Sequence, residues 1–186
     1  MKTTTKLIAA AFTAVALFIG TSNVNAQSIS GKGVRFGIGV EGLLPTGNLH
    51  DISNVGVGIT PRLQFGVADN LGITLTSGYL NYFGKEINNS GFKTKSYGMI
   101  PVKAGIKAFV SQNIYLSGEV GAAFETSGFG EVKGGPDLDT NTKLLASPGI
   151  GWANQSWDVG VRYENYSGQS NNFGTVGLRI AYGFGL

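Results

Sequence analysis

The chain has 186 residues, enough for one domain, and contains no cysteine. The lack of cysteine excludes a disulfide framework, a thiolate metal site and a lipid anchor attached through cysteine. Only 13% of the residues are charged, whereas soluble domains usually carry about a quarter. Together with 30 glycines, this sparse charge is atypical of a soluble protein.

The beginning of the chain has the pattern of a cleaved secretory signal peptide. Lys2 and Lys6 precede an apolar run that is too short for a spanning helix, which needs about 20 residues. Val24-Asn25-Ala26 then fits the small-x-small cleavage rule. Cleavage leaves 12 basic and 11 acidic residues, a net charge of +1 that does not favour nucleic-acid binding. We therefore expect a signal peptide over residues 1–26 and a mature domain over residues 27–186.

The mature chain alternates apolar residues with glycine or polar residues, which is the period-two pattern of β-strands. In chain order, the expected strands cover residues 34–41, 59–67, 71–79, 100–108, 114–124, 144–152, 157–164 and 176–186. Each has roughly ten residues, the length that a tilted strand needs to cross a bilayer. No later segment is apolar over about 20 residues, so we expect no transmembrane helix after the signal.

The expected connections alternate between short turns and long polar loops. The short turns cover residues 68–70, 111–113 and 154–156, and the long loops cover residues 44–55, 83–95, 125–141 and 166–172. This asymmetry is typical of outer-membrane barrels, which have short periplasmic turns and longer extracellular loops. An even number of strands places both termini in the periplasm.

Charged residues within the strands fall on the glycine and polar face and never on the apolar face. They are Arg35, Glu41, Arg62, Lys103, Lys107, Glu119, Asp158, Arg162, Glu164 and Arg179. A sheet in hydrocarbon can pair all its backbone groups only as a closed barrel. One face then meets lipid and the other the lumen, so we expect these residues to form a lumenal salt-bridge network. A soluble small barrel would instead bury its apolar face and expose its charges.

Aromatic residues near the strand ends are expected to form two girdles at the membrane interfaces. The residues are Phe65, Tyr79, Tyr97, Phe124, Trp152, Trp157, Tyr163 and Phe184. Trp152 and Trp157 flank an expected periplasmic turn, with Phe65 and Phe184 at a similar depth. The others lie near the opposite strand ends.

The stretches 97–107 and 117–124 and the terminal strand resemble the outer-membrane protein β-barrel domain family, the small barrels related to the OmpA transmembrane domain and OmpX. The resemblance covers residues 33–186. It implies an all-β, eight-stranded antiparallel transmembrane barrel in the outer membrane of a Gram-negative cell, in contact with lipid and lipopolysaccharide. It also implies that the last strand is read by the barrel-assembly machinery. That assembly signal would comprise Tyr182, Phe184 and Leu186.

Three features of the expected loops have more specific interpretations. His50 and Ser53 have the side chains of a base and a nucleophile, although neighbouring loop residues need not converge on one site. Asp137-x-Asp139-x-Asn141 resembles the start of a calcium loop but lacks the later glycine and acidic ligand. Three lysines are suited to lipopolysaccharide phosphates. These are Lys85, Lys93 and Lys95.

We therefore expect a non-enzymatic barrel with a structural or surface-interaction role, with its loops displayed outside to an extracellular ligand. We expect no cofactor and no metal site. An eight-stranded barrel is only wide enough for its own side chains, which favours a plugged lumen. Two alternatives remain open, namely a narrow porin-like channel for small solutes or ions and a lipid-modifying enzyme centred on His50.

Overall fold

The computed structural model describes residues 33–86, 93–168 and 171–186, so the expected signal peptide lies outside the described residues. The strands are β1 (Val34–Gly47), β2 (Ser53–Ala68), β3 (Leu71–Ser77), β4 (Tyr79–Gly84), β5 (Tyr97–Phe109), β6 (Ile114–Glu125), β7 (Thr142–Ala153), β8 (Trp157–Ser167) and β9 (Phe173–Gly185). One short helix, α2 (Asn48–Ile52), lies between β1 and β2. In the described part of the chain, no helix is long and apolar enough to span a membrane.

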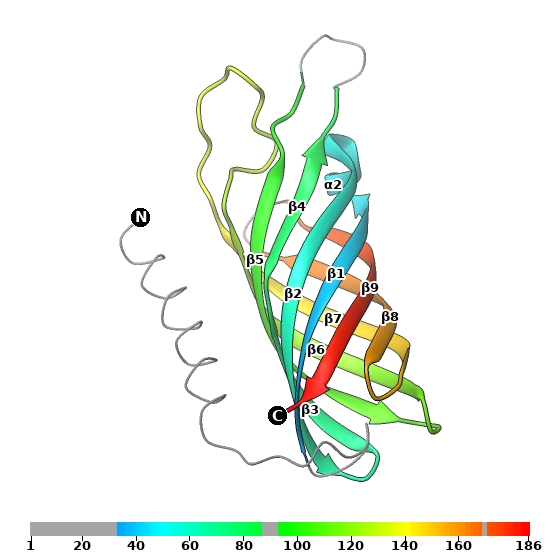
Figure 1. Ribbon diagram of the computed structural model, residues 1–186. Helices are drawn as coiled ribbons and strands as arrows, with labels where there is room; N and C mark the ends of the chain where they lie inside the picture. Colours follow the sequence, from blue (N-terminus) through cyan, green and yellow to red (C-terminus); the bar gives the residue numbers. More distant parts are fainter. Residues whose placement is uncertain (1–32, 87–92, 169–170) are drawn as a thin grey trace.

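Antiparallel pairing runs around the molecule and closes it into a barrel, where β1 meets β9 (Figure 1). β3 and β4 are two parts of one spanning strand, since both pair with β2 on one side and β5 on the other. The barrel therefore has eight spanning strands, which confirms the expected fold class. Gly78 separates β3 from β4, and a Cβ there would collide with the carbonyl oxygen of Ile59. Only glycine permits this close approach.

The outer surface of the barrel is apolar. Large hydrophobic side chains on every spanning strand are exposed, among them Val40, Ile59, Ile106, Val120, Leu144, Ile150 and Leu178. Glycine, polar and charged residues alternate with them and point inward, as the period-two pattern predicts. A closed sheet that is apolar outside and polar inside matches the two environments of a barrel in hydrocarbon.

The long connections lie at the end opposite the C-terminus (Figure 1). The first of them is shorter than expected, because β1 continues beside β9 as far as Gly47, which pairs with Phe173. α2 then turns the chain into β2, so most of residues 44–55 is strand or helix. The third and fourth connections begin and end close to their expected positions, after Glu125 and Ser167. The barrel therefore extends further on the loop side than the sequence pattern indicates.

Candidate functional site

Ion pairs fill the middle of the lumen. Arg62 contacts Glu119 at 3.1 Å, and Lys103 lies 3.2 Å from Glu119 and 2.7 Å from Glu164. Arg162 continues the chain, with 2.9 Å to Glu164 and 2.7 Å to Glu41. All of these side chains are almost completely buried. Each carboxylate therefore joins two strands that are not neighbours in the sheet, and the network ties the walls of the barrel together.

A second group of ion pairs lies towards the periplasmic end. Lys107 pairs with Asp158, and Arg179 lies 3.5 Å from Glu41 and 4.0 Å from Asp158. Nine of the ten charged residues expected in the lumen are buried there, and the tenth, Arg35, is half-buried at the periplasmic mouth. Threonine hydroxyls complete the network, since Thr76 donates to Glu119 at 2.7 Å. Buried charges need such partners, because an unpaired charge in a low-dielectric interior is costly.

One buried ion pair escaped the sequence analysis. Lys143 lies 3.6 Å from Glu125, and both side chains are buried near the outer end of the lumen. Neither residue belongs to an expected strand, because Glu125 begins the expected loop over residues 125–141 and Lys143 lies just before the expected strand over residues 144–152. Lys143 has the same inward parity as Leu145, so extending the expected strand by one residue would have revealed it.

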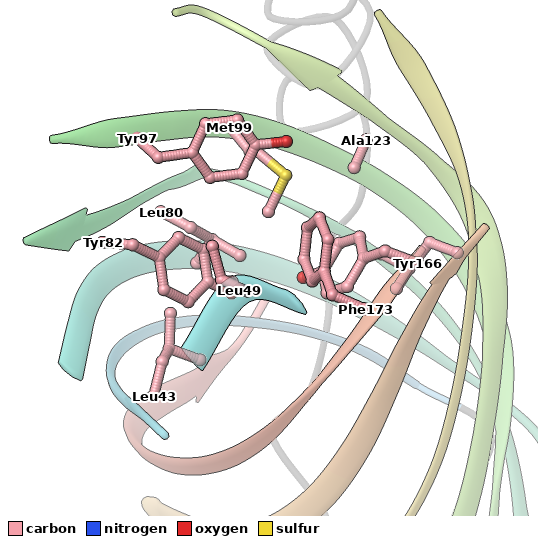
Figure 2. Packing of buried hydrophobic residues seen from close by; sticks show 10 residues of the cluster. Leu43, Leu49, Leu80, Tyr82, Tyr97, Met99, Ala123, Tyr166 and Phe173 are labelled. Carbon is pink, nitrogen blue, oxygen red and sulfur yellow. The ribbon is translucent and has the colours of Figure 1, made fainter. Parts of the chain in front are cut away.

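The outer half of the lumen is an apolar cluster rather than a polar one (Figure 2). We call this cluster the outer plug, and it comprises Leu43, Leu49, Leu80, Tyr82, Tyr97, Met99, Ala123, Leu145, Tyr166 and Phe173. Tyr166 stacks on Phe173 with 4.8 Å between ring centroids, and Tyr97 meets Phe173 edge-on at 5.9 Å. α2 contributes Leu49, which has no exposed surface. The outer plug is not among the features expected from the sequence, although its strand residues share the inward parity of the charged ones.

Tyrosine hydroxyls join the outer plug to the ion pairs below it. Tyr166 donates to Glu164 at 2.8 Å, and Tyr97 donates to Glu125 at 2.7 Å. A third tyrosine, Tyr82, shares a hydrogen bond of 3.2 Å with Thr175. A buried tyrosine usually needs such a partner for its hydroxyl. The rings therefore fill the upper lumen while their polar ends satisfy the charged layer.

Tyr97 corrects one of the girdle predictions. We expected it at the lipid interface, but it is 1% exposed and lies inside the outer plug. The reason is parity, because Tyr97 shares the odd-numbered inward face of β5 with Lys103 and Lys107. The other expected girdle residues lie on the outside, half-buried or exposed. They are Phe65, Tyr79, Phe124, Trp152, Trp157, Tyr163 and Phe184.

A smaller aromatic cluster lies at the other end of the lumen. Phe109 and Tyr115 meet edge-on with 5.7 Å between ring centroids. The Lys107 ammonium lies 3.8 Å from the Tyr115 ring centroid, a cation–π distance. Tyr115 also donates its hydroxyl proton to Asp158 at 2.7 Å. In the described part of the barrel, side chains thus fill the lumen in three layers. The layer at the periplasmic end is aromatic, the middle layer is ionic, and the layer at the loop end is the apolar outer plug.

Two outer loops are joined by backbone and side-chain contacts. We call the described residues 85–86 and 93–96 loop A, and residues 126–141 loop B. The Lys95 amide donates to the Glu131 carbonyl at 2.6 Å, and the Lys133 amide donates to the Lys93 carbonyl at 2.9 Å. Thr94 and Val132 form an antiparallel bridge between these bonds. Loops A and B therefore continue the sheet beyond the barrel, side by side (Figure 1).

Lys95 forms a charged latch between the same loops. Its ammonium lies 2.7 Å from Asp137 and 3.2 Å from Glu131. The hydrogen bond to Asp137, followed by that to Glu131, raises the pKa of Lys95, and Lys95 in turn lowers the pKa of Asp137. Glu131 also accepts the backbone amides of Gly128 at 2.7 Å and Leu138 at 3.0 Å, which lowers its pKa. The Glu131 carboxylate therefore organises the turn of loop B.

The other loop interpretations find no geometric support. Ser53 is buried and donates its hydroxyl proton to the Val55 carbonyl at 3.1 Å, while the neighbouring His50 side chain is exposed. Asp137 forms an ion pair with Lys95, and no group of three metal-ligating side chains occurs among the described residues. Lys85 donates hydrogen bonds to the His50 carbonyl of α2 and to Asn54, so it helps to hold α2 in place. Exposed lysines remain at Lys93 and Lys133.

Comparison with known proteins gives a consistent picture of the fold. No family model and no curated protein matches the sequence. Among solved structures, Ail, the attachment invasion locus protein of Yersinia pestis, aligns with a TM-score of 0.60 and 16% identity, over 83% of this chain and 100% of that chain. The fold is that of the small eight-stranded outer-membrane barrels.

Two further outer-membrane barrels align over similar lengths. The N-terminal β-barrel domain of Pseudomonas aeruginosa OprF has a TM-score of 0.55 and 10% identity, over 81% of this chain and 97% of that chain. Neisserial surface protein A has a TM-score of 0.53 and 15% identity, over 83% of this chain and 97% of that chain. The closed fold and the apolar outer surface show that this barrel is an integral protein of the cell outer membrane.

Proposed function

We propose that this outer-membrane barrel is a non-enzymatic surface-interaction protein that displays loops A and B as a fixed platform outside the cell. The observation that carries the proposal is the join between these loops through Lys95, Glu131 and Asp137. Loops that are ordered before binding lose less conformational entropy when a ligand docks. The filled lumen supports the same function, because it leaves the outer surface as the place where a partner is met.

The platform carries two exposed lysines at adjacent positions. The antiparallel bridge between Thr94 and Val132 places Lys93 opposite Lys133. Like charges directly opposite each other on a sheet repel, so an anionic group between them is favourable. Ail has been solved in complex with the heparin analogue sucrose octasulfate, with a TM-score of 0.56 and 17% identity to this chain. We therefore propose an anionic group on the partner, with sulfated sugar as the first probe.

Binding of sucrose octasulfate to the folded barrel in detergent tests this proposal. Isothermal titration at low salt is expected to give measurable binding that weakens as salt is added. The double variant Lys93→Gln/Lys133→Gln is expected to lose at least tenfold in affinity. The matched control is Lys85→Gln, which removes a lysine that hydrogen-bonds to the His50 carbonyl and Asn54. This variant should keep most of the affinity. Equal binding by both variants would contradict the role of the platform.

Conductance of the refolded protein in a planar bilayer tests the filled lumen. We expect a silent bilayer, since the outer plug and the ionic layer each close the lumen across its width. Insertion is verified by recovering the folded protein from the same membrane. Steady, reproducible openings would instead support the narrow channel.

A further inference from the structure

A small cavity lies at the periplasmic end of the lumen, between β1, β2, β8 and β9. Its volume is about 20 Å³, and it is lined by Arg35, Arg62, Gln64, Asp158 and Arg179 together with small residues. Gly37, Ala181 and Gly183 complete the lining of the cavity. A cavity needs roughly 10–15 Å³ to hold one water-sized occupant. The space therefore suits a single small ion or molecule.

The charges around this cavity are not balanced. Three guanidinium groups face one carboxylate, and Asp158 is already engaged by Lys107 and by the Tyr115 hydroxyl. Arg179 reaches Asp158 only at 4.0 Å. Arg62 donates its Nη2 group to Glu119 at 3.1 Å. The cavity is therefore a site of net positive charge.

Arg35 is the group that lacks a partner. Its Nη1 and Nη2 atoms are buried from solvent and donate to no acceptor among the described residues. Its side chain lies flat on β9, where a Cβ at Gly183 would lie 2.6 Å from the Arg35 Nε. Burying guanidinium donors without acceptors is unfavourable, which points to a missing acceptor.

The whole described lumen shows the same imbalance. Seven basic side chains face five carboxylates, and each carboxylate already has a basic partner. The basic residues are Arg35, Arg62, Lys103, Lys107, Lys143, Arg162 and Arg179, and the acidic ones are Glu41, Glu119, Glu125, Asp158 and Glu164. A water molecule would satisfy hydrogen bonds but leave the charge unchanged.

We propose that this cavity binds one small monovalent anion of the halide type, such as chloride, between Arg35 and Arg179. The anion accepts the buried Arg35 donors and offsets part of the excess positive charge of the lumen. The cavity volume fits a halide better than phosphate, sulfate or an organic carboxylate. Bound halide stabilises the folded barrel, because it binds the native state and has no such site in the unfolded chain.

Thermal unfolding of the detergent-solubilised barrel tests the site. The midpoint in sodium chloride is compared with that in sodium gluconate at equal ionic strength, because gluconate is too large for the cavity. We expect the wild type to unfold about 3 °C or more higher in chloride. Arg35→Gln removes the unpartnered charge and is expected to abolish this difference. Lys85→Gln, a matched loss of one positive charge at the opposite end, is expected to keep it.

Crystals of the wild-type barrel grown with sodium bromide provide a second measurement that does not depend on the folding of Arg35→Gln. We expect an anomalous bromide peak within hydrogen-bond distance of the Arg35 guanidinium. Equal midpoints in chloride and gluconate would overturn the site. A chloride effect that persists in Arg35→Gln, or bromide-containing crystals without a peak at Arg35, would do the same.

Discussion

Single residues in the lumen hold several partners at once, so their removal affects more than one contact. Arg162 is 7% exposed and contacts both Glu164 and Glu41. Arg162→Ala would leave carboxylates buried with fewer compensating charges, which typically costs about 3–5 kcal/mol. We expect this loss in the free energy of unfolding measured by denaturant titration in lipid vesicles. Arg162→Met keeps most of the length of the side chain but not the charge, and it should be almost as unstable as Arg162→Ala. An unfolding midpoint that is unchanged in both variants would show that the network does not stabilise the barrel.

Glycines on the inner face make room for the arginines, and one pair of glycines tests this role. A Cβ at Gly39 would lie 2.7 Å from the Arg179 Nε, whereas a Cβ at Gly42 would meet nothing within 4 Å. Gly39→Val should displace Arg179 from Thr60 and destabilise the barrel by about 1–3 kcal/mol. Gly42→Val adds an apolar group to the outer surface of the same strand and should be neutral or stabilising. The two variants are compared by denaturant titration, and equal effects would contradict the packing argument.

At the scale of elements, the latch between loops A and B should depend on pH. Carboxylates with a lowered pKa stabilise the folded state above their ordinary pKa, and this contribution is lost as the pH falls through the lowered pKa. For Glu131 the ordinary value is 4.5, and its pKa in the folded protein is lower. Lys95 has a raised pKa, so its contribution is complete below 10.5 and is lost only above that value. The latch should therefore be intact at neutral pH and released in acid.

Hydrogen exchange of the amides that bind Glu131 measures this release. Gly128 and Leu138 donate to its carboxylate, and their protection, corrected for the intrinsic exchange rate, should fall as the pH is lowered through the depressed pKa of Glu131, below the ordinary value of 4.5. Glu131→Gln keeps an acceptor oxygen without the titrating charge. In this variant the protection of the Gly128 and Leu138 amides should not change with pH in this range. Protection that persists in acid in the wild type would show that backbone pairing alone holds the loops.

At the scale of the whole molecule, two layers close the lumen independently. Tyr97→Ala removes a ring from the outer plug and should cost about 3–5 kcal/mol in the free energy of unfolding. The ionic layer below it stays in place, so the variant should still be silent in a planar bilayer. Tyr79→Ala is the matched control, because this tyrosine of β4 is 48% exposed on the outer surface. Openings in Tyr97→Ala alone would show that the ionic layer does not seal the barrel.

The sequence pattern predicts the barrel well because the period-two alternation is set by the lipid on one side of every strand. The same parity places Arg62, Glu119 and Arg162 inside, as the structure shows. It does not predict the outer plug, since Leu80 and Met99 are apolar on an inward face and the pattern alone does not distinguish lumen from lipid there. The latch also escapes prediction, because Lys95 and Asp137 are far apart in the chain and meet only through the fold.

The closure of the barrel between β1 and β9 also determines how the chain must fold. The first and last strands of the described chain are neighbours, with Arg35 paired to Gly185 and Gly47 to Phe173. Contacts between distant parts of a chain form slowly, because a large loop must close first. Until β9 arrives, β1 and β8 each present an unpaired edge that can join another chain. Aggregation during refolding should therefore depend on how soon the C-terminal strand reaches the N-terminal one.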